Sequence, residues 1–295
     1  MAPQLERAAR IQGLVFCILA ACTSVASWWL PRLAPHVELG LLMGLIVVVG
    51  VPHGAVDPAY LSLPRHTSRW RAWAGFAARY LALAAAVLTL WLVWPAAGLG
   101  AFLAMSALHF SGDAARGATR ATRALQGTAV IVLPALWHSV ETEATLGYLA
   151  GGAAAAHCLS VLRPLTLPVA FGLGLAALVE LRRGHVLVAA EAAATVIVAV
   201  TAPPLVGFTV YFCGMHSARH LLRTADRVHL SWRQLALLAC LPLLGTVATG
   251  FVAWRLLAHL PVDVVMIRVV FIGLAALTVP HMAVVERARF ARLAA

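Results

Sequence analysis

Charged residues are scarce in this sequence, and lysine is absent from it. Only 11% of the 295 residues are charged, 62% are hydrophobic, and the mean hydropathy is +0.89. Soluble domains of this length do not have such a composition, whereas runs of about 20 apolar residues are typical of transmembrane helices. No polar stretch is long enough to form a soluble domain. We therefore expect one integral membrane domain over residues 1–295.

The few cysteines also limit the possible functions. The five cysteines show no CxxC motif and no paired spacing, so neither a disulfide framework nor a cysteine metal site is expected. The net charge of +11 would suit a nucleic-acid-binding protein, but all 22 basic residues are arginines that alternate from loop to loop. This alternation indicates membrane topology, and we expect no nucleic-acid partner.

The apolar runs predict the fold class. It is all-α, a polytopic membrane bundle of about ten transmembrane helices, with a range of eight to ten because several runs are short or contain Gly and Pro. The candidate spans are 11–30, 37–57, 73–94, 98–115, 122–140, 164–181, 185–202, 205–222, 234–253 and 264–285. The stretch 144–160, rich in Ala and Gly, is expected to be either interfacial or re-entrant.

The arginines predict the orientation of these spans. Seventeen of the 22 lie before the first span or around and after the ends of the even-numbered spans, and only four lie on the opposite side. Cytoplasmic loops of membrane proteins carry the excess of basic residues. We therefore expect both termini in the cytoplasm and a multi-pass protein of the cell inner membrane.

Five of the twelve histidines fall inside the predicted spans. They lie in four spans that run in the same direction, all in the half of the membrane nearer the cytoplasm, and they are His53, His109, His216, His220 and His281. Ionisable residues within a membrane are costly and tend to mark function. A single membrane histidine is more often a hydrogen-bonding group between helices. Five at matched depth favour a shared site.

The spacing of these histidines suggests metal binding. "HSARH" places His216 and His220 four residues apart, on one face of a helix. "HGAVD" and "HFSGD" each place an aspartate, Asp57 or Asp113, one turn after a histidine. Each carboxylate is expected either to accept the N–H of a metal-binding imidazole or to end its helix at the interface.

The donor type narrows the choice of metal. Imidazoles without thiolates suit Fe, Zn, Cu or Ni. H-E-x-x-H is absent, which disfavours a zinc metalloprotease, and so are the adjacent histidine pairs of membrane desaturases. A single iron held by four histidines from three helices is the simplest interpretation.

Four segments resemble a known family. "GVPHGAVDPAY", "ALHFSGDA", "YFCGMHSARHLLR" and "ALTVPHM" are similar to the successive motifs of the Brp/Blh family of membrane β-carotene 15,15′-dioxygenases, which supply retinal to microbial rhodopsins. The resemblance implies a catalytic domain that uses Fe(2+) and O2 to cleave β-carotene into two retinals. It implies the iron ligands His53, His109, His216 and His220, and leaves His281 with an accessory role.

The substrate implied by the resemblance is a long hydrocarbon that dissolves in membrane lipid. An apolar pocket near the iron is therefore expected, and the candidate residues are Phe110, Tyr211, Phe212, Gly214 and Met215. Two other classes of function stay open. One is a transporter or proton relay built on the His and Asp residues, and the other is a different histidine-ligated membrane oxygenase or hydrolase.

Overall fold

The computed structural model describes residues 3–61 and 69–291, and within these ranges the chain forms helices and no strand. Two short π-helical segments, η1 and η3, and one 3-10 turn, η2, join α-helices. In chain order the elements are α1 (Pro3–Trp29), α2 (Pro35–Leu45), η1 (Ile46–Gly50), α3 (Pro52–Ala55), η2 (Asp57–Tyr60), α4 (Arg69–Val93), α5 (Pro95–Phe110), α6 (Arg120–Val132), α7 (Pro134–Trp137), α8 (Ser139–Ala150), α9 (Gly152–Arg182), α10 (Val186–Thr201), α11 (Pro204–Val210), η3 (Tyr211–Ser217), α12 (Ala218–Val228), α13 (Trp232–Leu256) and α14 (Val262–Ala291).

Each predicted span coincides with one helix or with a run of consecutive helices. Six segments of the described chain are long and apolar enough to cross a membrane: Leu5–Trp29, Pro35–Tyr60, Trp70–Val93, Gly152–Arg182, Trp232–Leu256 and Val262–Glu286. α5 and α10 are apolar but shorter, α6 ends before Pro134, and the eighth run turns into the arginine-rich α12. The all-helical fold is confirmed for the described residues, and ten crossings stay a prediction.

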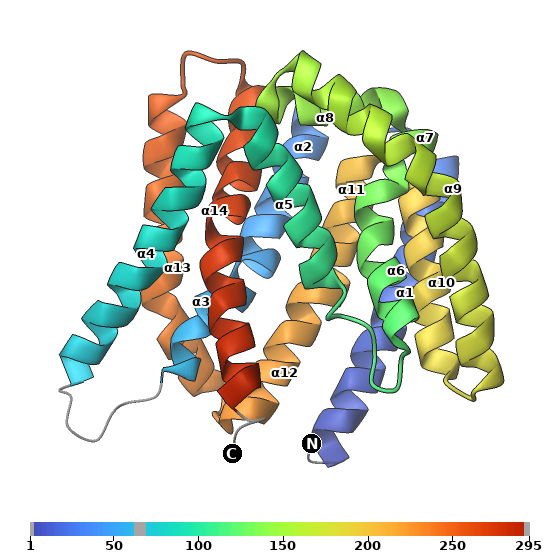
Figure 1. The fold of residues 1–295 in the computed structure, drawn as a ribbon, viewed down its shortest axis with the longest axis horizontal. Coiled ribbons are helices and arrows are strands. Elements are labelled where there is room, and N and C mark those ends of the chain that lie inside the picture. Colours follow the sequence, from blue (N-terminus) through green and yellow to red (C-terminus); the bar gives the residue numbers. More distant parts are fainter. Residues whose placement is uncertain (1–2, 62–68, 292–295) are drawn as a thin grey trace.

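The helices form a bundle with its termini at one end. Figure 1 shows that α1 begins and α14 ends at the lower end of the bundle, and that α8 runs across the upper end. α8 and the first turns of α9 occupy the stretch 144–160, and Gly151, with φ of 90°, makes the turn between them. That this end of the bundle faces the cytoplasm stays a prediction. Two of the arginines on which that prediction rests, Arg65 and Arg292, lie outside the described residues.

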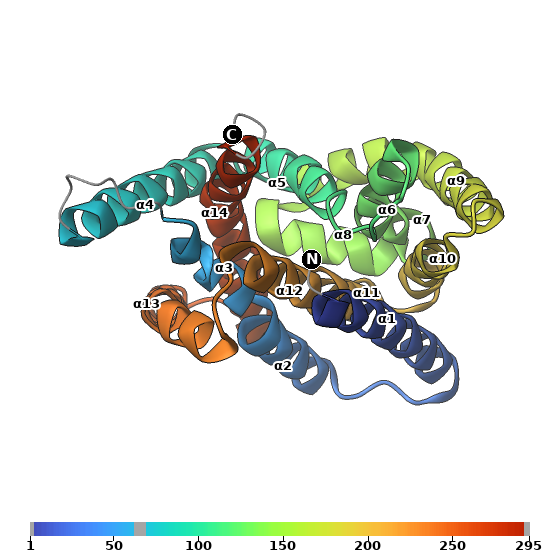
Figure 2. The ribbon, with the colours of Figure 1, turned by 90° about the horizontal axis from the view of Figure 1, so that it is seen from below.

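The interior of the bundle holds a cluster of buried polar groups within a largely apolar core, and the outside of the bundle is also apolar. Seen along the helices, α3 and α12 lie in the interior, between α2 and α13 on one side and α5 and α14 on the other (Figure 2). Large apolar side chains such as Trp29, Phe171 and Leu241 are exposed on outer helices. Water-soluble monomers rarely expose so much apolar surface, whereas lipid covers it in a membrane. The interior helices carry the candidate site.

Candidate metal centre

All five predicted membrane histidines meet in the interior of the bundle. Their rings come from α3, α5, η3, α12 and α14, and the centroids of neighbouring rings are separated by 4.5 Å for His109–His216 and by up to 6.4 Å for His216–His220. The Nε2 atoms of His53 and His216 are 3.3 Å apart. The sequence thus predicted the members of this histidine cluster, including His281, whose ring lies 5.0 Å from that of His109.

The two π-helical segments position His53 and His216. Gly50 ends η1, and a Cβ there would collide with the ring of Phe212 in η3, so the close approach of the segments requires glycine. The carbonyl of Gly50 accepts hydrogen bonds from His53 Nδ1 at 2.6 Å and from Ser217 Oγ at 3.0 Å. Pro52 begins α3 and has no N–H to donate, which interrupts the helical hydrogen-bond pattern between η1 and α3. Such π-helical turns often occur at functional sites.

The aspartates pair with histidines of other helices. Asp57 accepts a hydrogen bond from His281 Nδ1 at 2.8 Å, and Asp113 accepts one from His216 Nδ1 at 3.0 Å. Asp57 therefore pairs with a histidine other than the preceding His53, and Asp113 with one other than the preceding His109. The reason is local: α3 ends at Ala55 and α5 at Phe110, so neither aspartate continues the helical face of its histidine.

A tyrosine supports each carboxylate. Tyr80 of α4 donates its hydroxyl to Asp57 at 3.0 Å, and Tyr211 of η3 donates to Asp113 at 3.1 Å. The site therefore contains two His–Asp–Tyr chains. From the sequence, Tyr211 is predicted to line a substrate pocket. The role of Tyr80 is not predicted, because no local spacing connects Tyr80 to Asp57.

Two arginines hold the loop that follows His109. Arg219 donates to the backbone carbonyl of Asp113 at 2.8 Å, and Arg223 donates to those of Gly112 and Ala114 at 2.5 and 3.0 Å. Arg219 is buried and forms a two-pronged ion pair with Glu191 of α10. From the sequence, both arginines are predicted only to mark the membrane topology. A usable signal was their spacing from His216, three and seven residues, which places all three on one helical face.

The nitrogen atoms of the cluster fit a transition-metal ion. The Nδ1 atoms of His53, His216 and His281 each face an oxygen that can only accept a hydrogen bond, so each ring carries a proton on Nδ1. Unless the ring is doubly protonated, its Nε2 atom then has a free lone pair. The ligand nitrogens of His53, His109 and His281 lie within 4.8 Å of one another. The Nε2 atoms of His109, His220 and His281 are buried and have no hydrogen-bond partner among the described residues. Metal-binding histidines characteristically donate their other N–H to a carboxylate or carbonyl, as here.

The predicted pocket residues divide into two groups. The ring of Phe110 lies 4.9 Å from that of His216, and Phe212 lies 5.4 Å from His53, so both line the cluster. Gly214 and Met215 instead face α1: the Gly214 carbonyl accepts from Gln12 at 2.7 Å, and the Met215 sulfur lies 4.0 Å from the same amide. The prediction of a pocket at these two residues does not fit this orientation, because residues 214 and 215 turn away from the face of η3 that carries His216.

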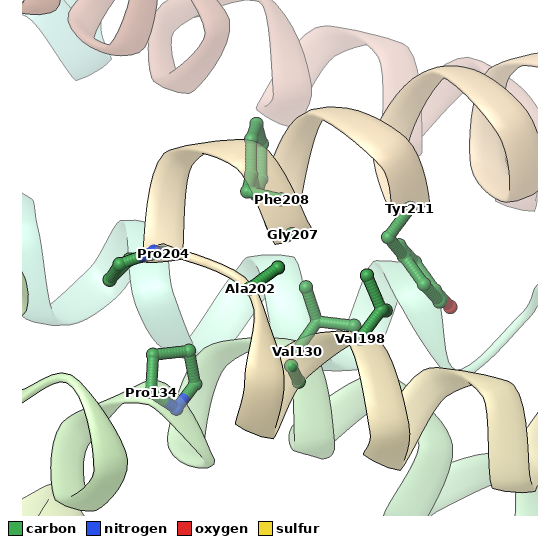
Figure 3. Close-up of a pocket in the computed structure, with 9 residues that line it drawn as sticks. Val130, Pro134, Val198, Ala202, Pro204, Gly207, Phe208 and Tyr211 are labelled. Atoms are coloured by element: carbon green, nitrogen blue, oxygen red, sulfur yellow. The ribbon is translucent and has the colours of Figure 1, made fainter. Parts of the chain in front are cut away.

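Two apolar cavities lie beside the cluster. The larger, about 110 Å³, lies between α4, α5 and α14 and is lined by Val87, Leu90, Gly98, Ala101, Phe102, Met105, Ala275, Thr278 and Val279. Met105 precedes His109 by one turn, and Thr278 precedes His281 by three residues. The smaller cavity, about 10 Å³, lies where Val130 and Val198 face Gly207 and Tyr211 (Figure 3). It is too small for a hydrocarbon chain.

The fold and the histidine cluster together define a class: all-helical proteins with several helices long and apolar enough to cross a membrane, and with an interior histidine cluster that could hold a metal ion. Within this class, the chain belongs to the β-carotene 15,15′-dioxygenase family, whose model matches residues 44–288. A β-carotene 15,15′-dioxygenase of an uncultured marine bacterium, 66A03, is 30% identical over 83% of this chain and 91% of its own. A probable β-carotene 15,15′-dioxygenase Blh of Halobacterium salinarum is 30% identical over 95% and 92%. No solved structure matches the chain.

Proposed function

We propose that this protein is an iron-dependent membrane dioxygenase that cleaves the central 15,15′ double bond of β-carotene with O2 to give two molecules of retinal. Family membership supports the reaction. The observation that carries the metal-dependent chemistry is the cluster of imidazole nitrogens, three of which, the Nε2 atoms of His109, His220 and His281, are buried and have no hydrogen-bond partner in the described part of the chain. Imidazole donors suit iron.

The proposed iron ligands are His53, His109, His216 and His220. When bound, Fe(2+) supplies the chemistry with O2 that amino-acid side chains lack. The protein holds and orients the ligands. Asp113 fixes the tautomer of His216, and the Gly50 carbonyl fixes that of His53. Phe110 and Phe212 cover the cluster and keep water away from it.

The larger cavity supports a hydrocarbon substrate. Its lining is apolar except for Thr278, whose hydroxyl donates to the Leu274 carbonyl of its own helix. Ala101 in the lining is exposed on the outer face of α5, so the cavity is open to the surroundings of the bundle. In a membrane these surroundings are lipid, from which a carotenoid can enter without crossing water.

The rival function of a proton relay has less support. A relay needs titratable groups distributed across the membrane. Glu191, a buried acidic residue outside the cluster, forms an ion pair with Arg219, and among the described residues its side chain has no hydrogen bond to a histidine.

Expression in cells that accumulate β-carotene tests the proposal. The wild-type chain should bleach the cells and produce retinal, and His53→Ala should do neither although the protein is still inserted in the membrane. His157→Ala changes an exposed histidine of α9 and serves as the matched control, with wild-type bleaching expected. A wild-type chain that is inserted and carries stoichiometric iron but forms no retinal would contradict the proposal.

A further inference from the structure

The position of His281 within the histidine cluster resembles that of the four proposed iron ligands. It lies on α14 and is 2% exposed. Its ring centroid is 5.1 Å from that of His53, 5.0 Å from His109 and 4.8 Å from His220. It therefore contacts three of the four proposed ligands and lies inside the cluster rather than behind it.

Its hydrogen bonds prepare its Nε2 atom for a cation. Nδ1 donates to both carboxylate oxygens of Asp57, at 2.8 and 2.9 Å, and Asp57 is held in turn by Tyr80. With its proton on Nδ1, a neutral ring directs a lone pair from Nε2. That Nε2 is buried and has no partner among the described residues. Buried polar atoms in folded proteins nearly always have a hydrogen-bond partner. The Nε2 atom of His281 is therefore expected to bind a ligand.

The same construction surrounds His216. That histidine donates Nδ1 to Asp113, Asp113 accepts the hydroxyl of Tyr211, and Nε2 points into the cluster. The two chains reach the cluster from different helices, η3 and α14. Because His216 and His281 each donate Nδ1 to an aspartate that is held by a tyrosine, we expect both rings to have the same role toward the metal.

We propose that His281 is a nitrogen ligand of the metal, in addition to the four histidines of the proposed iron site, and that Asp57 and Tyr80 hold it in place. This assignment rests on the proposed function, because it concerns the same iron centre. In this assignment, Asp57 orients the ring of His281 through its hydrogen bond to Nδ1.

The test uses the full-length protein purified in detergent without oxygen. Wild type, His281→Ala, Asp57→Asn and the control His157→Ala are stripped of metal and titrated with Fe(2+) and with Co(2+), whose visible absorption reports the number and type of its ligands. Loss of a carboxylate that supports a ligand costs about 10–100-fold in affinity. We expect Asp57→Asn to lose metal affinity in that range. His281→Ala should lose more affinity and show an altered Co(2+) spectrum. Free imidazole added to His281→Ala should restore the wild-type spectrum.

Two results separate this assignment from the proposed function. If wild type binds metal and His281→Ala keeps the wild-type Co(2+) spectrum while losing no more affinity than Asp57→Asn, His281 only positions its neighbours and the assignment is overturned. If wild type itself binds neither metal, the iron centre is overturned as well. Should His281→Ala fail to fold, His281→Gln, which retains bulk and an amide donor for Asp57, is measured by the same criteria.

Discussion

The Nε2 atom of His53 lies 3.3 Å from the Nε2 atom of His216. Each ring donates its Nδ1 hydrogen elsewhere, to the Gly50 carbonyl and to Asp113. Two neutral rings would thus direct lone pairs at each other, which is repulsive in the dry interior of the bundle. The contact becomes favourable when a positive charge lies between the two rings, and this charge can be either a metal ion or a shared proton.

Metal removal should therefore destabilise the folded protein. A metal at 100 times its Kd contributes about 2.7 kcal/mol to the free energy of unfolding. We expect a chelator to lower the Tm of the purified protein by several degrees, and Fe(2+) to restore it, as measured by thermal unfolding in detergent. His53→Ala should lose this dependence on metal. A wild-type Tm indifferent to chelator and Fe(2+) would argue for a shared proton at this contact.

The pairing of each aspartate with a distant histidine can be tested by double-mutant cycles. Asp113→Asn should lower metal affinity about 10–100-fold through His216. Because Asp113 acts through His216, its effect and that of His216→Gln should be strongly non-additive. The matched cycle combines Asp113→Asn with His109→Gln, the histidine of its own motif, and should be closer to additive. Stronger coupling to His109 than to His216 would contradict the observed pairing.

The ion pair between Glu191 and Arg219 should be important for stability. Both side chains are at most 4% exposed, and Arg219 also holds the loop at Asp113. Removing one partner of a buried pair leaves the other charge uncompensated and costs about 3–5 kcal/mol. We expect this loss in the free energy of unfolding for Glu191→Gln, measured with denaturant in detergent. Glu141→Gln, which removes an exposed partner of Arg32, is the control and should cost at most about 1 kcal/mol. If Glu191→Gln and Glu141→Gln lowered the free energy of unfolding equally, the buried ion pair would contribute no more to stability than the exposed one.

The sequence predicted the helical fold and the members of the histidine cluster because both depend on local signals. Apolar runs predict helices, and histidine is conspicuous in such runs. The pairing of Asp57 with His281 joins residues 224 positions apart, and only packing of α14 against η2 creates it. The sequence does contain one hint of this role: the tripeptide VPH that carries His53 recurs at His281. The breaks in helix after Ala55 and Phe110, which redirect the aspartates, coincide with Asp57-Pro58 and Ser111-Gly112, dipeptides that favour turns, but these do not indicate which histidine each aspartate meets.

The cavity between α4, α5 and α14 should hold one arm of the substrate. Its lining on α5 extends from Met105 to Gly98, and Gly98 lies eleven residues before His109, about 16 Å along the helix. The conjugated chain of β-carotene is about as long as the hydrocarbon core of a membrane is thick, about 30 Å. Half of it is therefore about 15 Å, so cleavage at the centre beside His109 would place one end near Gly98.

Filling this cavity should block β-carotene while sparing the metal. A side chain that overfills a packed site costs about 1–3 kcal/mol, which corresponds to about 5- to 150-fold in binding. We expect Ala101→Phe to lower retinal formation from β-carotene by such a factor, with iron content unchanged. Ala104→Phe makes the same change on the exposed face of α5, outside the cavity lining, and should behave as wild type. An apocarotenoid shortened at one end should be cleaved by Ala101→Phe almost normally, since its missing end no longer needs the filled space. Equal activity of the two Phe variants toward β-carotene would show that the substrate arm lies elsewhere.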